Sequence, residues 1–140
     1  MPTLEDAILL AVKAHRGRKD KAGAAYILHP LRVMLRMKTK DERIAAVLHD
    51  VIEDTNYPLE DLRKAGYREK ILRSLDHLTK REGEEYDQFI KRVKRNPLAR
   101  KVKIADIEDN LDLGRIKNLK KRDFTRIEKY RRALSELMKG

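Results

Sequence analysis

Hydrophobic residues recur along this chain at the three- and four-residue spacing of amphipathic helices. Near the N-terminus, Thr3 can cap a helix with apolar positions at Leu4, Ala7, Ile8, Ala11 and Val12. Over residues 124–138 the pattern returns, opposite a face rich in Lys and Arg. No segment shows the strict alternation of a strand. We therefore predict an all-α fold, a compact helical bundle in which residues 1–140 form a single domain.

Proline and capping residues mark the starts of the inner helices. Pro30 is predicted in the first turn of a helix, which would leave His29 extended just before it. Asp41 is predicted to cap a helix that continues through residues 49–54. Further helices are predicted over residues 58–65, around 71–78, over 84–95, and from Asn96-Pro97 to near Gly114.

Chain length, cysteine content and net charge limit the kinds of site and partner that this protein can have. The 140 residues suit one domain without a second catalytic module, and the lack of cysteine excludes disulfides and thiolate metal ligands. No apolar run is long enough to span a bilayer, and the first residues do not form a signal peptide, so we expect a cytoplasmic protein without a membrane partner. The net charge of +11 indicates a polyanionic partner, which could be a nucleotide, a nucleic acid or an anionic lipid headgroup, and solvated Lys/Arg faces without a specific partner are the simpler explanation. Of these partners we expect a small anionic nucleotide substrate, because of the motifs described below.

One predicted helix carries four polar groups among apolar neighbours. His49 and Asp50 are adjacent, and Glu53 and Asp54 each follow one of them by four residues, so they share its face of the helix. Burying such groups costs free energy unless they have partners. A divalent cation with imidazole and carboxylate ligands is an economical partner.

Two more residues complete a candidate metal site. His29 precedes a proline, and Asp106 is a carboxylate in the otherwise apolar neighbourhood of Val102 and Ala105. Taken singly, each residue has an ordinary structural alternative, such as a helix cap or a satisfied core imidazole. The order His-Pro, His-Asp-x-x-Glu-Asp, Ala-Asp-x-x-x-Asn is much more restrictive and favours metal. The predicted ligands are His29, His49, Asp50 and Asp106.

The same motifs resemble the RelA/SpoT-type hydrolase domain of the HD superfamily, including its small stand-alone guanosine tetraphosphate hydrolases. The resemblance spans roughly residues 7–115 and rests on Ala14-His15, residues 26–31, residues 45–55, Leu78-Thr79, and Lys103 to Asp106 with Asn110. It implies an all-α HD-domain fold, a divalent metal, most often Mn²⁺, on the four ligands above, and removal of the 3′-pyrophosphate from guanosine tetra- or pentaphosphate. It also implies that Glu53 and Asp54 act on the catalytic water.

Five residues are predicted to contact the nucleotide. Arg18 and Lys19 would reach its base or its phosphates, Tyr26 belongs to the same pocket, Asn110 would hold the ribose or a phosphate oxygen, and Lys103 would neutralise the leaving phosphate. A solvated basic surface is the alternative explanation for the three basic residues. The sequence departs from the family at Arg16-Gly17-Arg18 and at Ala25, which indicates an altered base pocket. It also departs after Asn110, which indicates altered substrate contacts on that side.

Three functions therefore stay open. The first is an alarmone hydrolase, the second is an HD phosphatase acting on another nucleotide such as a nucleoside phosphate or NADPH, and the third is a non-catalytic basic protein that binds nucleic acid. The sequence does not choose among divalent metals. It also leaves the oligomeric state open, with a homodimer as one option.

Overall fold

The computed structural model describes residues 1–112 and 118–139. Within these ranges the chain is helical between its loops, apart from one isolated antiparallel bridge between Lys19 and Ala25. The helices are α1 (Leu4–His15), α2 (Leu28–Leu35), α3 (Lys40–Leu48), α4 (Val51–Thr55), α5 (Leu59–Lys64), α6 (Glu69–His77), α7 (Tyr86–Lys94), α8 (Pro97–Asn110) and α9 (Lys121–Met138). The predicted all-α class is confirmed.

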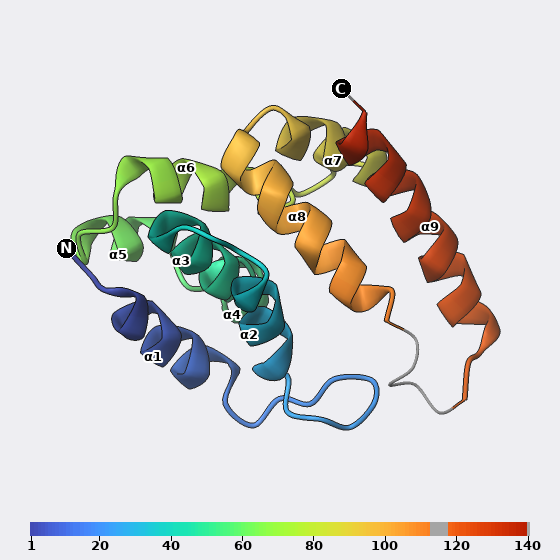
Figure 1. Ribbon diagram of the computed structural model, residues 1–140, viewed down its shortest axis with the longest axis horizontal. Coiled ribbons are helices and arrows are strands. Elements are labelled where there is room, and N and C mark those ends of the chain that lie inside the picture. The colour runs from blue at the N-terminus through green and yellow to red at the C-terminus, as the bar shows by residue number, and fades with distance from the viewer. Residues whose placement is uncertain (113–117, 140) are drawn as a thin grey trace.

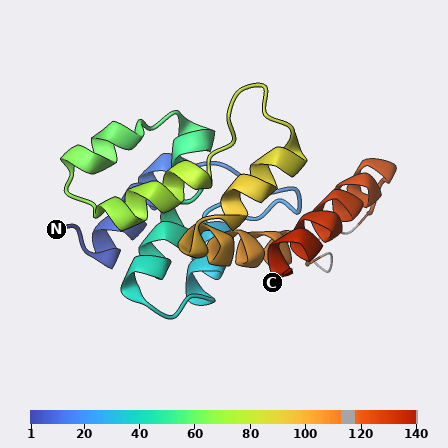
Figure 2. The same ribbon diagram turned by 90° about the horizontal axis from the view of Figure 1, so that it is seen from above.

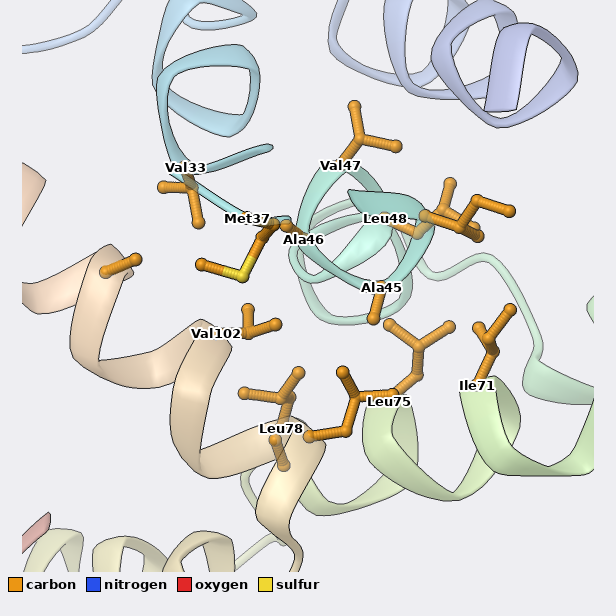
Figure 3. Close-up of a cluster of buried hydrophobic side chains, with 14 of the residues drawn as sticks. Val33, Met37, Ala45, Ala46, Val47, Leu48, Ile71, Leu75, Leu78 and Val102 are labelled. Atoms are coloured by element: carbon orange, nitrogen blue, oxygen red, sulfur yellow. The ribbon is translucent and has the colours of Figure 1, made fainter. Parts of the chain in front are cut away.

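Helix α3 lies at the centre of the fold. Its last five residues, Ile44 to Leu48, are all fully buried, as expected for a helix that is apolar on every side. It packs against α1, α2, α6 and α8, and Figure 3 shows side chains from α2, α6 and α8 around it, including Val33, Leu75 and Val102. This packing places the C-terminal end of α3, where His49 follows, deep inside the molecule.

Helix α9 completes the fold at the opposite end from α1. It packs against α7 and α8, and Figures 1 and 2 both show it along the outer side of α8. Its Ala133 and Leu137 are buried, whereas Phe124 near its start is 57% exposed. No helix in the described part of the chain is long and apolar enough to cross a membrane.

Side-chain caps set the starts of three helices. Thr3 and Thr39 each form a capping box with the acidic residue three positions later, and Asn96 accepts a hydrogen bond from the Ala99 backbone N–H at 2.9 Å just before Pro97. The prediction that Asp41 caps α3 was wrong. Asp41 lies in the first turn, and the Thr39 hydroxyl satisfies the backbone N–H of Glu42 instead.

Two predictions about the histidine segments were also wrong. His29 is not extended before its helix but lies in the first turn of α2, where a proline one position later blocks no intrahelical hydrogen bond. The predicted single helix through residues 49–54 is broken in two. His49 is the C-cap of α3, and Asp50, with φ −101° and ψ −7°, is the N-cap of α4.

The end of α8 differs from the prediction as well. The helix ends at Asn110, and Leu111 caps it through backbone hydrogen bonds to Asp109 and Ile107. Gly114, near which the end was expected, lies outside the described residues. The earlier end leaves Asp106, Asp109 and Asn110 in the last turns of α8, beside α2.

Candidate metal centre

Two imidazoles and one carboxylate converge where α2, α3 and α8 meet. Nε2 of His29 lies 2.8 Å and Nε2 of His49 lies 3.3 Å from the same oxygen, Oδ1 of Asp106. The three residues are nearly inaccessible to solvent, with exposed fractions of 5%, 4% and 4%. Residues separated by up to 77 positions in the sequence therefore share one buried polar cluster.

The orientation of His49 follows from its backbone neighbour. Nδ1 lies 2.5 Å from the Ala46 carbonyl oxygen, and because a carbonyl only accepts hydrogen bonds, Nδ1 carries a proton. Nε2 faces Asp50 Oδ2 at 3.1 Å and Asp106 Oδ1 at 3.3 Å. It makes no well-aligned hydrogen bond to any residue in the described ranges. A buried ring nitrogen that faces two carboxylates without a well-aligned hydrogen bond has the donor set that a cation could complete.

His29 is held on both sides of its ring. Nε2 faces Asp106, and Nδ1 lies 2.6 Å from Oδ2 of Asp109. Asp109 in turn accepts two hydrogen bonds from Arg32, at 2.7 Å from Nε and 3.1 Å from Nη2. One imidazole thus lies between two carboxylates from successive turns of α8.

The charges of the cluster shift its pKa values in opposite directions. Burial alone would lower the pKa of both histidines, but hydrogen bonding, first to Asp106, raises that of His29, and the charges of Asp50 and Asp106 raise that of His49 well above its ordinary value. Burial would raise the pKa of Asp50, yet the neighbouring His49 lowers it to about 2. Lys103 and His49 likewise hold the pKa of Asp106 well below its usual range, against burial. The histidines and the carboxylates thus stabilise each other's charged forms.

The donor set fits a divalent metal ion. One ligand atom each from His29, His49 and Asp50 lie within 4.8 Å of one another, and Asp106 contacts both imidazoles. Two imidazoles with carboxylates suit manganese, iron, zinc and similar ions. The structure thus brings together the four residues predicted as ligands.

A chain of contacts links Asp50 to the loop between α1 and α2. The Tyr26 hydroxyl donates a hydrogen bond to Asp50 Oδ2. The guanidinium of Arg18 lies 4.2 Å from the centroid of the Tyr26 ring and bonds to both His15 Nδ1, at 3.1 Å, and Asp54 Oδ2, at 3.2 Å. Arg18 is therefore an ordered residue beside the cluster, although its side chain is 41% exposed.

Lys103 is also part of the cluster. Its Nζ lies 2.8 Å from Asp106 Oδ2 and 5.3 Å from the centroid of the Phe89 ring, with only 15% of the side chain exposed. Although burial opposes it, the charge of Asp106 raises the pKa of Lys103 above its ordinary value. A solvated surface position, the alternative from the sequence, is therefore wrong for Lys103. Glu53, one of the two predicted catalytic residues, accepts a hydrogen bond from the Lys80 backbone N–H at 2.9 Å.

Two cavities flank the cluster. One, of about 340 Å³, has Arg18, Lys19, Tyr26 and Asn110 in its wall, four of the five residues predicted to contact the nucleotide. The other, of about 640 Å³, is lined by the residues Glu53, Lys80, Gly83, Glu84, Glu85, Tyr86, Phe89, Lys103, Lys129 and Tyr130. Asn110 also donates to Asp106 Oδ1 at 3.3 Å. The predicted substrate residues are thus divided between two cavities, with Lys103 in the larger one and the other four in the smaller one.

Sequence reasoning missed three residues here. Asp109 and Arg32 orient His29, and Tyr130 of α9 lines both cavities. The signal for Asp109 was present, because a residue three positions after Asp106 shares its helix face. Tyr130 lies within the amphipathic pattern predicted over residues 124–138, which does not distinguish it as a site residue.

Known proteins with similar sequences include hydrolases of guanosine-3′,5′-bis(diphosphate). The chain is 28% identical over 120 residues to a guanosine-3′,5′-bis(diphosphate) 3′-pyrophosphohydrolase of Aquifex aeolicus, covering 77% of this chain and 17% of the relative. It is 37% identical over 78 residues to the protein of the same name from Borreliella burgdorferi, covering 53% and 12%. It is 46% identical over 65 residues to a GTP pyrophosphokinase of Streptomyces coelicolor, covering 44% and 8%. The chain thus spans less than a fifth of the length of these relatives.

A solved structure shares the whole fold. It is that of a metazoan ortholog of SpoT that hydrolyses ppGpp, and it superposes with a TM-score of 0.76 at 19% identity, covering 100% of this chain and 88% of the other. No family model matches the chain. The predicted resemblance is nevertheless confirmed: in sequence and in fold, this chain is similar to the RelA/SpoT-type hydrolase domain of the HD superfamily.

Proposed function

We propose that this chain is a metal-dependent phosphohydrolase that removes the 3′-pyrophosphate from guanosine tetraphosphate or pentaphosphate. The position of His49 supports this most directly, since its buried Nε2 faces two carboxylates without a well-aligned hydrogen bond. The names of the similar proteins point to the same substrate. The products are guanosine 5′-diphosphate, or the triphosphate, and pyrophosphate, because water replaces the ribose 3′-oxygen on phosphorus.

The residues proposed to hold the metal are His29, His49, Asp50 and Asp106, and the metal proposed is Mn²⁺. The two imidazoles would bind through Nε2, since Nδ1 of each is engaged by Asp109 or by the Ala46 carbonyl. A divalent cation there supplies a water of lowered pKa and neutralises charge that builds on the phosphoryl oxygens.

Glu53 and Asp54 are proposed to handle the proton of the attacking water. Both lie on α4, immediately after Asp50 at the cluster. Glu53 lines the larger cavity and is held by the Lys80 backbone, which leaves it suited to accept a proton. Asp54 is paired with Arg18, so it would also hold that arginine near the nucleotide.

The two cavities are proposed to hold the two ends of the nucleotide. Arg18, Lys19, Tyr26 and Asn110 would contact the nucleoside in the smaller cavity, where the Arg18 guanidinium lies over the Tyr26 ring. Lys103 would neutralise charge on the pyrophosphoryl group as it passes from the ribose 3′-oxygen to water in the larger cavity. The ion pair of Lys103 with Asp106 keeps this ammonium beside the proposed metal.

The test is a substrate comparison with added Mn²⁺. Guanosine tetraphosphate, NADPH and guanosine monophosphate are supplied separately, and phosphate and pyrophosphate release give kcat/KM for each. We expect pyrophosphate release from guanosine tetraphosphate, with a kcat/KM at least about 100-fold above the others, as for a site built to bind one set of polar groups.

Other results of the substrate comparison would favour one of the two alternative functions. Phosphate release from NADPH or the monophosphate at a higher kcat/KM would assign the site to another nucleotide. No turnover of any substrate, together with salt-sensitive and metal-independent binding of a polynucleotide, would contradict the enzyme proposal and favour a nucleic-acid-binding protein.

A further inference from the structure

Asp109 and Arg32 form a buried assembly behind His29, on the side away from the other three proposed ligands. Nδ1 of His29 lies 2.6 Å from Asp109 Oδ2, while Arg32 donates to both oxygens of that carboxylate. Asp109 is 1% exposed and the Arg32 side chain 31% exposed. The carboxylate is thus enclosed, and the arginine reaches it from the protein surface.

The assembly determines which ring nitrogen of His29 faces the candidate metal centre. Because Arg32 donates hydrogen bonds to both oxygens of Asp109, both oxygens act as acceptors and the side chain is a carboxylate. A carboxylate only accepts hydrogen bonds, and Nδ1 of His29 must therefore donate. Nε2 is then directed to the side where Asp106 and His49 lie.

The geometry also couples two helices at this point. Arg32 follows His29 by three residues on α2, and Asp109 follows Asp106 by three residues on α8. Each helix therefore contributes one residue of the cluster and one of the assembly behind it. A rotation of the His29 ring would break the contact with Asp109 and the contact with Asp106 together.

We propose that Asp109, held in place by Arg32, is a positioning residue that fixes the orientation and protonated nitrogen of His29 for binding of a divalent cation. This inference rests on the proposed function, because it takes His29 as a metal ligand. A carboxylate behind a ligating imidazole raises the basicity of the ligand and restricts its rotation. Arg32 offsets the charge that would otherwise be buried alone with Asp109.

The first experiment measures Mn²⁺ affinity of the purified chain by electron paramagnetic resonance of free Mn²⁺, without substrate. We expect Asp109→Asn to weaken binding by about 10- to 100-fold, as is typical when such a partner of a metal ligand is changed. Glu108→Gln is the matched control, because it removes a neighbouring, exposed α2–α8 ion pair with Arg36 and does not contact His29. Its Mn²⁺ affinity should stay within about twofold of the parent.

A second pair of variants covers the case in which Asp109→Asn does not fold. Arg32→Lys keeps a positive charge beside Asp109, and Arg32→Gln does not, so affinity should fall in the order parent, Lys, Gln. Equal Mn²⁺ affinity across the folded variants and the parent would overturn the positioning role while leaving the proposed hydrolase intact. A parent that turns over no nucleotide and binds no Mn²⁺ would overturn both.

Discussion

Asp106 Oδ1 lies 2.8 Å from Nε2 of His29, so a carboxylate occupies the direction in which that imidazole would present a lone pair to a metal. Without a metal, a proton between the two atoms makes this contact favourable. Burial opposes the charged imidazole, but the bond to Asp106 contributes to a raised His29 pKa, and nearby charges raise that of His49 further. A metal bound at the proposed site would therefore compete with protons for the same nitrogen atoms.

This competition predicts that Mn²⁺ binds more tightly as pH rises. Raised pKa values mean that protonated His29 and His49 stabilise the metal-free fold fully below their ordinary value of 6.5, and that this stabilisation is lost as pH rises through the raised values. Isothermal titration calorimetry in buffers of different ionisation enthalpy should detect proton release on Mn²⁺ binding at neutral pH. An affinity that does not change between about pH 6 and pH 8 would contradict the competition.

Tyr26→Phe should distinguish the role of the Tyr26 hydroxyl from the role of its ring. The hydroxyl donates to Asp50, whereas the ring stacks on Arg18 and is retained in phenylalanine. We expect Mn²⁺ affinity to fall by about 10-fold, because a proposed ligand loses a hydrogen-bond donor that orients it. The KM for guanosine tetraphosphate at saturating Mn²⁺ should be nearly unchanged. A change in KM alone would instead assign the hydroxyl to the substrate.

Arg18→Gln should act on the substrate and not on the metal. Arg18 lines the smaller cavity and contacts His15, Tyr26 and Asp54, none of which is a proposed ligand. Loss of one charge-assisted contact to the nucleotide is expected to raise KM by about 10-fold or more, with Mn²⁺ affinity preserved. Arg16→Gln, at an exposed arginine two residues earlier, is the control and should leave KM unchanged. Equal KM values for both variants and the parent would place the nucleotide elsewhere.

Glu42 should contribute pH-dependent stability far from the site. Hydrogen bonding to Lys101 is the main reason why the pKa of Glu42 falls to about 2 from its ordinary value of 4.5, with the Lys38 and Thr39 backbones also donating to it. A lowered pKa stabilises the fold above pH 4.5, and this contribution is lost as pH falls toward 2. We expect Glu42→Gln to lower the free energy of unfolding by about 1 kcal/mol at neutral pH.

Urea unfolding at neutral and acidic pH measures this difference. It should shrink as pH falls, because the parent Glu42 becomes neutral as well. Glu60→Gln is the control, since the pair of Glu60 with Arg63 is largely exposed and should contribute little. A difference for Glu42→Gln that is constant with pH would show that its charge is not the cause.

The convergence of the metal cluster was the most predictable feature of the molecule. His29, His49, Asp50 and Asp106 were grouped from the order of short motifs, and the structure brings them together although they come from different helices. That they bind metal stays a prediction. Thr39 could have been identified as the cap of α3, because Glu42 three residues later completes a capping box.

Other features depend on packing that no local pattern records. No glycine or proline marks the break between His49 and Asp50, and the break leaves both side chains at the cluster. The partner of Asp109 lies 80 positions earlier in the sequence, at His29, so their contact follows from how α2 lies on α8. Helix periodicity predicts the elements but not which of their polar residues meet.

Asp106→Asn is the most direct test of the metal-dependent hydrolase. The protein is stripped of metal with a chelator, and pyrophosphate release from guanosine tetraphosphate is followed with and without added Mn²⁺. We predict that the parent releases pyrophosphate only with Mn²⁺ and that kcat/KM of Asp106→Asn is lower by at least about 100-fold, while Glu108→Gln behaves like the parent. Equal turnover by Asp106→Asn and the parent, or equal turnover with and without Mn²⁺, would contradict the assignment of this cluster as a catalytic metal site.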